Sequence, residues 1–130
     1  PGVREACGRL RAAGFALVAG WAAATFRPDF PLPLLVLLGE HGSAKTTTAR
    51  VLKALLDPSA ADARSEPREV RDLMIQARNE WVLFFDNLSG LRGWLSDALC
   101  RLATGGSFTT RGLYTDADEV ILTAKNPVLM

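Results

Sequence analysis

The stretch GEHGSAKT, residues 39–46, constrains this chain more than any other feature. It matches the spacing G-x-x-x-x-[G/A]-K-[S/T], with Ala44 where a second glycine is usual. A run of five apolar residues, 34–38, precedes it, and a helical pattern from Lys45 to Leu56 follows. In such a loop the backbone N–H groups converge on phosphate oxygens, and the positive end of the helix strengthens their attraction. The sequence therefore predicts a phosphate-binding loop for a nucleoside triphosphate, with ATP and Mg²⁺ as the expected ligands.

Each loop residue type has a chemical reason to be there. The Lys45 ammonium is expected to reach the β- and γ-phosphates, and the Thr46 hydroxyl to bind Mg²⁺. Gly42 keeps the loop permissive, and a helical backbone at Ala44 would tolerate its methyl group. The histidine, His41, is either above the γ-phosphate or a solvated loop residue, and it lacks the partners that a metal site needs. The predicted nucleotide-binding residues are Gly39, Glu40, His41, Gly42, Ser43, Ala44, Lys45, Thr46 and Thr47.

A second apolar run, residues 81–85, ends at Asp86, forty residues after Thr46. An aspartate at the tip of a neighbouring strand can hold Mg²⁺ through a water molecule, so Thr46 and Asp86 are the predicted metal-binding pair. The alternative is that Asp86 caps a turn with Asn87 and Ser89.

Hydrolysis is less directly indicated than binding. Asn87 stands where many ATPases have a glutamate that activates water, and an asparagine can orient a water molecule but cannot take its proton. Glu40, inside the loop, is the alternative base. The candidate catalytic residues are Lys45, Asp86, Asn87 and Glu40.

The order of elements predicts an α/β fold: a P-loop NTPase sandwich of three layers, α/β/α, with a mostly parallel sheet. Helices are expected over residues 3–26, 45–56, 70–77 and 91–102, and strands over 34–38, 63–65, 81–85, 107–114, 119–124 and from 128 onward. Residues 1–130 form one ATPase core, with an N-terminal helix (1–27) packed on it and a hairpin-like insertion (107–124). Because the chain stops within the apolar run 128–130, we expect a fragment truncated at its C-terminal end.

Composition excludes several classes of protein. The net charge is only +1, and the arginines are scattered among acidic residues. The chain therefore has no basic stripe of the kind that a dedicated nucleic-acid binder carries. The uncharged segment 12–26 is shorter than the roughly 20 apolar residues of a membrane-spanning helix, so it is interpreted as a buried helix. Cys7 and Cys100 have no metal-ligand spacing and are expected to be buried free thiols, which suits a cytoplasmic protein.

Three segments together resemble a known family. The loop, the strand that ends in Asp86 and Asn87, and the stretch from 99 to 114 resemble the ATPase core of phage- and plasmid-type superfamily 3 helicases, which are P-loop ATPases of the AAA+ class. The resemblance covers residues from about 14 to 130. It implies that Asp86 is the Walker B aspartate, that Arg111 contacts DNA or a neighbouring subunit, and that the intact protein forms a ring. The alternative for Arg111 is an ordinary arginine on the surface of a strand. It also implies a sensor residue just beyond Met130, with Asn126 as the alternative.

These observations lead to a first hypothesis of an ATP-driven motor for DNA replication, which acts as a homo-oligomeric ring and contacts DNA through the 107–119 hairpin. The acidic turn, residues 115–118, does not favour that contact, because a tip that meets DNA is usually basic. The alternative is a nucleotide-dependent switch or assembly module with little hydrolysis, which Asn87 favours. A recombinase of the RecA type fits the loop but fits residues 105–114 less well, and a small-molecule kinase would need an arginine-rich lid.

Overall fold

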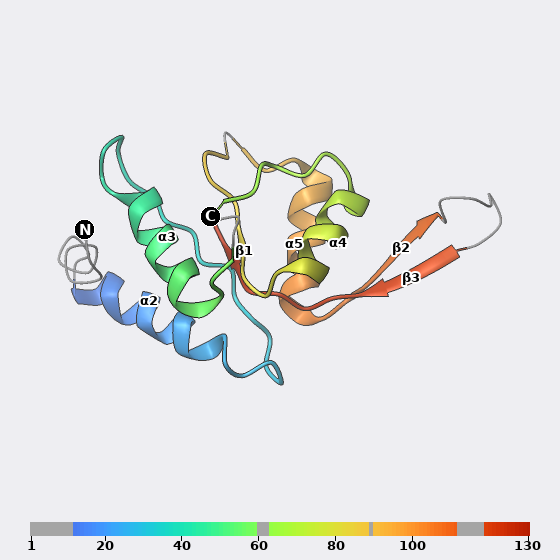
Figure 1. Ribbon diagram of the computed structural model, residues 1–130, viewed down its shortest axis with the longest axis horizontal. Helices are drawn as coiled ribbons and strands as arrows, with labels where there is room; N and C mark the ends of the chain where they lie inside the picture. The colour runs from blue at the N-terminus through green and yellow to red at the C-terminus, as the bar shows by residue number, and fades with distance from the viewer. Residues whose placement is uncertain (1–11, 60–62, 89, 112–118) are drawn as a thin grey trace.

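The computed structural model describes residues 12–59, 63–88, 90–111 and 119–130 (Figure 1). Along these residues helices alternate with short strands. Their bounds are α2 (Ala12–Ala24), α3 (Lys45–Leu56), α4 (Val70–Asn79), β1 (Leu83–Phe84), α5 (Gly93–Thr104), β2 (Ser107–Arg111), β3 (Glu119–Thr123) and β4 (Val128–Leu129).

Four chain segments run parallel to one another at the centre of the molecule. Strand β1 pairs with β4 in parallel, with Leu83 opposite Val128. Isolated parallel bridges join Leu35 to β4 on one side and Arg64 to Phe85 on the other. The order across the sheet is therefore Leu35, β4, β1, Arg64. All four segments are short, so the pairing extends over only a few residues of each.

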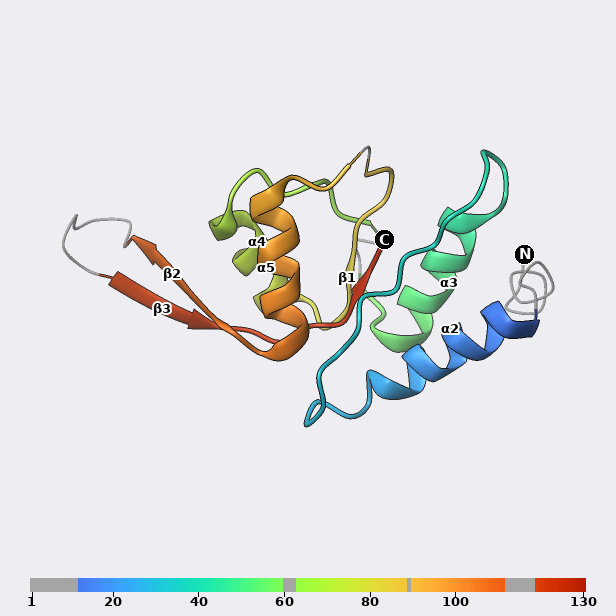
Figure 2. The same ribbon diagram turned by 180° about the vertical axis from the view of Figure 1, so that it is seen from behind.

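Side chains alternate between the two faces of this sheet, as they must in extended chain. Figures 1 and 2 show α2 and α3 on one side of β1 and β4, and α4 and α5 on the other. One buried cluster joins the strands to α2 and α3 and includes Val18, Trp21, Ala49, Leu52, Val82, Phe84 and Leu129. The other joins them to α4 and α5 and includes Leu73, Met74, Ala77, Leu83, Phe85, Leu95, Leu99, Leu102 and Val128.

The apolar run 34–38 differs from the predicted strand buried on both faces. It makes one bridge, at Leu35, and its backbone pairs with β4 through Leu35 N to Val128 O (2.9 Å) and Leu37 N to Met130 O (2.7 Å). Val36 and Leu38 are 49% and 89% exposed. The prediction of burial on both faces was wrong. Leu35 and Leu37 pack against the cluster with α2 and α3, but Val36 and Leu38 point to the other face and are exposed. Among the described segments this one pairs with β4 alone, and its composition does not show that position.

Helix α2 is half-buried rather than buried. Val18 and Trp21 are 8% and 5% exposed, and the Trp21 indole N–H donates to Pro33 O at 2.7 Å. Phe15 and Leu17, on the other side, are 46% and 72% exposed. The helix is apolar all round, so packing one face leaves apolar side chains on the opposite one. Of the helices in the described part of the chain, none has the length and apolar character to cross a membrane.

Strands β2 and β3 form an antiparallel ribbon that projects away from the helices (Figures 1 and 2). Phe108, 1% exposed, anchors its base in the core, whereas Ile121 is 67% exposed. The ribbon follows α5, whose C-cap residue Gly105 has the left-handed conformation (φ 83°) that glycine adopts readily. The acidic turn 115–118 lies outside the described residues. Cys100 is a free thiol but is exposed, contrary to the prediction, while Cys7 lies outside the described residues.

A buried ionic cluster fastens the C-terminal end of α3 to the segment that leads into β1. The Lys53 ammonium, on a side chain that is 2% exposed, donates to Asp57 Oδ2 (2.6 Å), Glu80 Oε2 (2.9 Å) and Val82 O (2.7 Å). Asp57 Oδ2 also accepts the backbone N–H groups of Trp81 and Val82, each at 2.9 Å. Arg64 pairs with the second oxygen of Glu80. This cluster fixes the position of α3 against β1.

Candidate functional site

Residues 34–38, which pair with β4, are called here the edge strand. The segment between the edge strand and α3 is a tight loop closed by a lysine. Lys45, the first residue of α3, turns its ammonium back to donate to Gly39 O (2.6 Å), Glu40 O (2.8 Å) and Ser43 Oγ (3.3 Å). Within the described residues, Lys45 has no carboxylate partner. Its positive charge is therefore held by neutral oxygen atoms, at the start of a helix whose first N–H groups also carry partial positive charge.

Two glycines suit this loop geometry. A Cβ on Gly39 would lie 2.6 Å from Ser43 Oγ, so the serine side chain would have to turn away from its present position. Gly42 has a φ of 79°, a conformation that side chains other than glycine rarely adopt. Gly39, a motif position, and Gly42, between the motif positions, thus each have a steric reason.

Ala44 corrects a prediction made from the sequence. It is the N-cap residue of α3, and its φ of 61° and ψ of 24° are left-handed, not the helical values that were expected to tolerate its methyl group. A non-glycine residue in this region costs about 1–2 kcal/mol. The cause is the sharp turn that the chain makes between the loop and α3. The position is thus one that glycine fits better than alanine.

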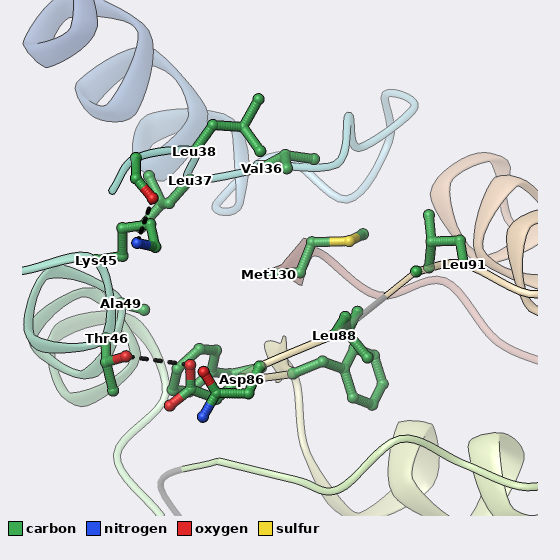
Figure 3. A pocket seen from close by; sticks show the side chains of 15 residues that line it. Val36, Leu37, Leu38, Lys45, Thr46, Ala49, Asp86, Leu88, Leu91 and Met130 are labelled. Carbon is green, nitrogen blue, oxygen red and sulfur yellow. Dashed lines mark hydrogen bonds between the residues drawn. The ribbon is translucent and has the colours of Figure 1, made fainter. Parts of the chain in front are cut away.

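The loop is joined to the end of β1 by one side-chain contact. The Thr46 hydroxyl donates to Asp86 Oδ1 at 3.1 Å, across forty residues of sequence (Figure 3). Thr46 lies in the first turn of α3, and Asp86 follows β1 and the bridging residue Phe85. Both side chains are half-buried. The two residues predicted from sequence to share a metal ion are therefore adjacent.

A cavity of about 380 Å³ opens beside this pair. Figure 3 shows Lys45 and Thr46 on one side of it, and Asp86 and Leu88 on another. Met130, which follows β4, also lines it, because the carboxyl ends of parallel strands meet at one edge of the sheet. The remaining lining is largely apolar and includes Val36, Leu38, Ala49, Phe85 and Leu91.

The other predicted catalytic residues are placed less specifically. Asn87 lines the cavity but is exposed, and its φ of 57° is left-handed, a conformation that asparagine tolerates better than most residues. Glu40 and His41 are exposed in the loop, and within the described residues the Glu40 carboxylate has no ion-pair partner. Thr47 is half-buried in the first turn of α3.

No three His, Cys, Asp or Glu side chains gather into a metal-binding group anywhere in the described ranges. A cation beside Thr46 and Asp86 would thus need further oxygen ligands from water or from a bound phosphate. Such a mixed set is typical of Mg²⁺, which keeps several waters and takes few protein ligands.

Comparison with protein families gives one match that covers nearly the whole chain. Residues 6–130 match the actinomycete integrative conjugative element replication proteins. The chain belongs to this family. Comparison with curated proteins and with solved structures gave no match.

Membership in this family corrects one prediction and confirms another in part. The resemblance to superfamily 3 helicases was wrong, because the family match over residues 6–130 is to a different group. The features that carried the resemblance are short, and a phosphate loop followed by a strand-end aspartate does not distinguish one family from another. The predicted role in DNA replication is confirmed at the level of the family, which is one of replication proteins.

Two residues that this resemblance singled out lie away from the cavity of this replication protein. Arg111 is the last residue of β2, where its backbone faces Glu119 in the ribbon that projects from the opposite side of the molecule to α3 (Figure 1). Its side chain lies outside the described ones. Asn126 is 2% exposed, and its amide N–H groups donate to Ala77 O, Glu80 O and Trp81 O at 2.8–3.0 Å. It precedes β4, at the end of the sheet opposite the cavity, and ties α4 to the segment before β1.

Proposed function

We propose that this replication protein binds a magnesium–nucleoside triphosphate, with ATP as the expected nucleotide, on the loop from Gly39 to Thr46. The observation that carries the proposal is the contact between Thr46 Oγ1 and Asp86 Oδ1 (3.1 Å) next to the Lys45 ammonium. A chance occurrence of the loop motif would have no reason to bring its threonine against a strand-end aspartate forty residues away.

The residues present fit Mg²⁺. A hydroxyl and a carboxylate oxygen are hard ligands, which Mg²⁺ prefers, and the adjoining cavity leaves room for water and for phosphate oxygens. When bound, the ion would neutralise charge on the β- and γ-phosphates. Thr46 and Asp86 would hold it, Thr46 directly and Asp86 directly or through water.

The residues of the loop also fit a phosphate. The oxygen atoms that hold the Lys45 ammonium are two carbonyls and a hydroxyl, all neutral, so phosphate oxygens would replace them with a charged partner. The α3 N-terminus, twelve residues of helix behind the loop, adds its partial positive charge at the same place.

We propose that the chain has the fold of a P-loop NTPase sandwich, with three layers, α/β/α. Its support is the parallel order Leu35, β4, β1, Arg64 with buried clusters on both faces, because parallel sheets occur almost only where helices cover both sides. In such a sheet ligands bind beyond the carboxyl ends of the strands, where Thr46, Asp86 and Met130 meet.

For the chemistry, two candidates remain. One is hydrolysis stimulated by DNA, as expected of a ring-forming motor in replication, with Asn87 orienting the attacking water and Glu40 as a base. The other is a switch that binds nucleotide and turns it over slowly. The exposed, left-handed Asn87 beside Asp86 favours the switch, because an amide cannot accept a proton from water.

The test is binding of Mg·ATP to the wild-type protein, followed by thermal unfolding and calorimetry, with Lys45→Ala and Thr46→Val as variants. Ligand at a hundredfold excess over Kd should stabilise the wild-type fold by roughly 2.7 kcal/mol. Lys45→Ala should abolish this effect, and Thr46→Val should abolish the part that depends on Mg²⁺. Matched controls are Arg50→Ala, exposed on the same helix, and Thr109→Val, exposed on β2.

No stabilisation of the wild-type protein by Mg·ATP would contradict the proposal. So would equal stabilisation of wild type and Lys45→Ala. Turnover measured with and without single-stranded DNA then separates the two chemistries: an increase with DNA favours the motor, and slow turnover that DNA leaves unchanged favours the switch.

A further inference from the structure

A second cavity adjoins the first along the phosphate loop. It has a volume of about 400 Å³ and lies between α2 and the edge strand, so it is called here the α2 groove. Helix α2 contributes Gly14, Leu17 and Val18 to its lining, and the edge strand contributes residues 35–38. Lys45 and residues 36–38 line both cavities, and Ser43 of the loop lines the α2 groove. A molecule held at Lys45 can thus extend into either.

We propose that the α2 groove holds the base and ribose of the nucleotide whose phosphates bind the loop. This inference rests on the proposed function and adds the position and type of the nucleoside subsite. Thr46 and Asp86 belong to the first cavity and Ser43 and Thr48 to the groove. The metal and the terminal phosphate are thereby assigned to one cavity and the nucleoside to the other, with Lys45 between them.

The lining of the groove suits a ligand that presents an apolar face. Its volume falls within the roughly 300–1,000 Å³ typical of small-molecule pockets, and most of its lining is aliphatic. Leu17 and Leu38 are 72% and 89% exposed although both are large and apolar. A base placed against them would remove apolar surface from water, and that burial supplies binding energy.

The same lining indicates little discrimination between bases. A site that selects one base usually presents amide, carboxylate or guanidinium groups to its edge. Among the described lining residues, the polar side chains are the Ser43 and Thr48 hydroxyls and the Lys45 ammonium, and the loop oxygens already hold Lys45. The groove therefore accepts adenine and guanine nucleotides with similar affinity.

The experiment compares Mg·ATP, Mg·GTP and Mg·tripolyphosphate, which has the phosphates but no nucleoside, by isothermal titration calorimetry. The variant is Leu17→Gln, and its matched control is Leu55→Gln, another exposed helical leucine (64% exposed) outside both cavities. Leu17→Gln should weaken ATP and GTP about tenfold, through the loss of one apolar contact, and leave tripolyphosphate unchanged. Leu55→Gln should change none of the three affinities. Unfolding temperatures of both variants confirm that they fold.

Each contrary result has a distinct meaning. If Leu17→Gln binds ATP as tightly as wild type, the nucleoside lies elsewhere and the proposed function stands. If the variant weakens tripolyphosphate as much as ATP, Leu17 acts through the fold and the subsite is overturned. A preference for ATP over GTP much above tenfold overturns the lack of discrimination. If wild-type protein binds neither ATP nor tripolyphosphate, the proposed function fails and this inference fails with it.

Discussion

Helix α3 carries a lysine near each end, and their surroundings are opposite. Lys45, at the loop end, is half-buried and contacts two carbonyl oxygens and a hydroxyl. Lys53, at the cluster end, is 1% exposed and contacts the carboxylates of Asp57 and Glu80 and the carbonyl of Val82. Among the residues that the structure describes, the same helix thus holds one ammonium paired with anions and another paired with neutral oxygen atoms alone.

These contrasting surroundings allow a helix–strand pair to be rigid and still receive a ligand. At the cluster end, Asp57 Oδ2 accepts the N–H groups at the start of the segment that forms β1. At the loop end, Thr46 contacts Asp86, just after β1. One end is neutralised by groups of the protein itself, whereas the other leaves positive charge facing a cavity. Fixing the first end holds the second in register, because both lie on the same helix and strand.

The largest expected effect comes from breaking the cluster end. Lys53→Met removes the buried ammonium that Asp57 and Glu80 share and leaves Glu80 with the partly exposed Arg64, so the free energy of unfolding should fall by about 3–5 kcal/mol. Lys45→Met, at the loop end, should change it by no more than about 0.5 kcal/mol. Urea unfolding followed by circular dichroism measures both. A larger loss for Lys45→Met than for Lys53→Met would reverse the assignment of structural and ligand-binding ends.

A second prediction concerns Asp86, which belongs to the loop end. Asp86→Asn removes the charge that would hold the cation but keeps the shape of the side chain. The stabilisation expected from Mg·ATP, roughly 2.7 kcal/mol at a hundredfold excess over Kd, should drop in the variant to the level that wild type shows with ATP and a chelator. Differential scanning calorimetry with and without Mg²⁺ tests it, with Asp97→Asn, exposed on α5, as the control. Full retention of the Mg²⁺ effect would remove Asp86 from the metal site.

The two ends also differ in how far the sequence alone predicts them. The loop end was predictable because its contacts lie within eight consecutive residues, and because a buried strand that stops at an aspartate places Asp86 beside the loop. The cluster end depends on Glu80, 27 residues after Lys53, and no spacing rule connects them. The Lys53–Asp57 pair by itself has the i,i+4 spacing of an ordinary surface ion pair.

Tertiary position explains the remaining errors of the sequence-based predictions. Residues 34–38 have the composition of a central strand, yet among the described segments they pair with β4 alone, and Val36 and Leu38 are exposed. Alanine favours helical backbone angles, but at position 44 the turn into α3 imposes a left-handed backbone. Asn126 resembles a site residue in sequence, but three carbonyl groups from α4 and the chain before β1 engage its amide. Tertiary contacts and turn geometry decide each of these features, and neither can be predicted from the local sequence pattern.

A smaller effect is expected at Ala44, where the loop is strained. Ala44→Gly removes a left-handed penalty of about 1–2 kcal/mol but adds the backbone entropy of glycine, about 0.5–1 kcal/mol, so the net stabilisation should be roughly 0.5–1 kcal/mol. Ala54→Gly, exposed in the interior of the same helix, should have the opposite sign and destabilise by about 1 kcal/mol. Urea unfolding of both variants measures the difference. If both changes destabilise the protein, the strain at Ala44 is not present in solution.

The smallest effect concerns the pH dependence of the cluster end. Burial disfavours the charged form of Asp57, but the hydrogen bonds from Lys53 and from the Val82 and Trp81 N–H groups outweigh it, so the pKa of Asp57 lies below its ordinary value. A carboxylate with a lowered pKa in the folded state contributes stability that is present above the unfolded-state pKa and is lost as the pH falls through the folded-state pKa. Wild-type stability should therefore decline below about pH 4. Asp57→Asn should be less stable at neutral pH and show a shallower decline in acid, measured as the urea midpoint at each pH.

Glu40→Gln, at the loop end, should keep the wild-type slope, because its exposed carboxylate has no ion-pair partner within the described residues. An equal change in slope for both variants would show that the acid sensitivity does not arise from the cluster end.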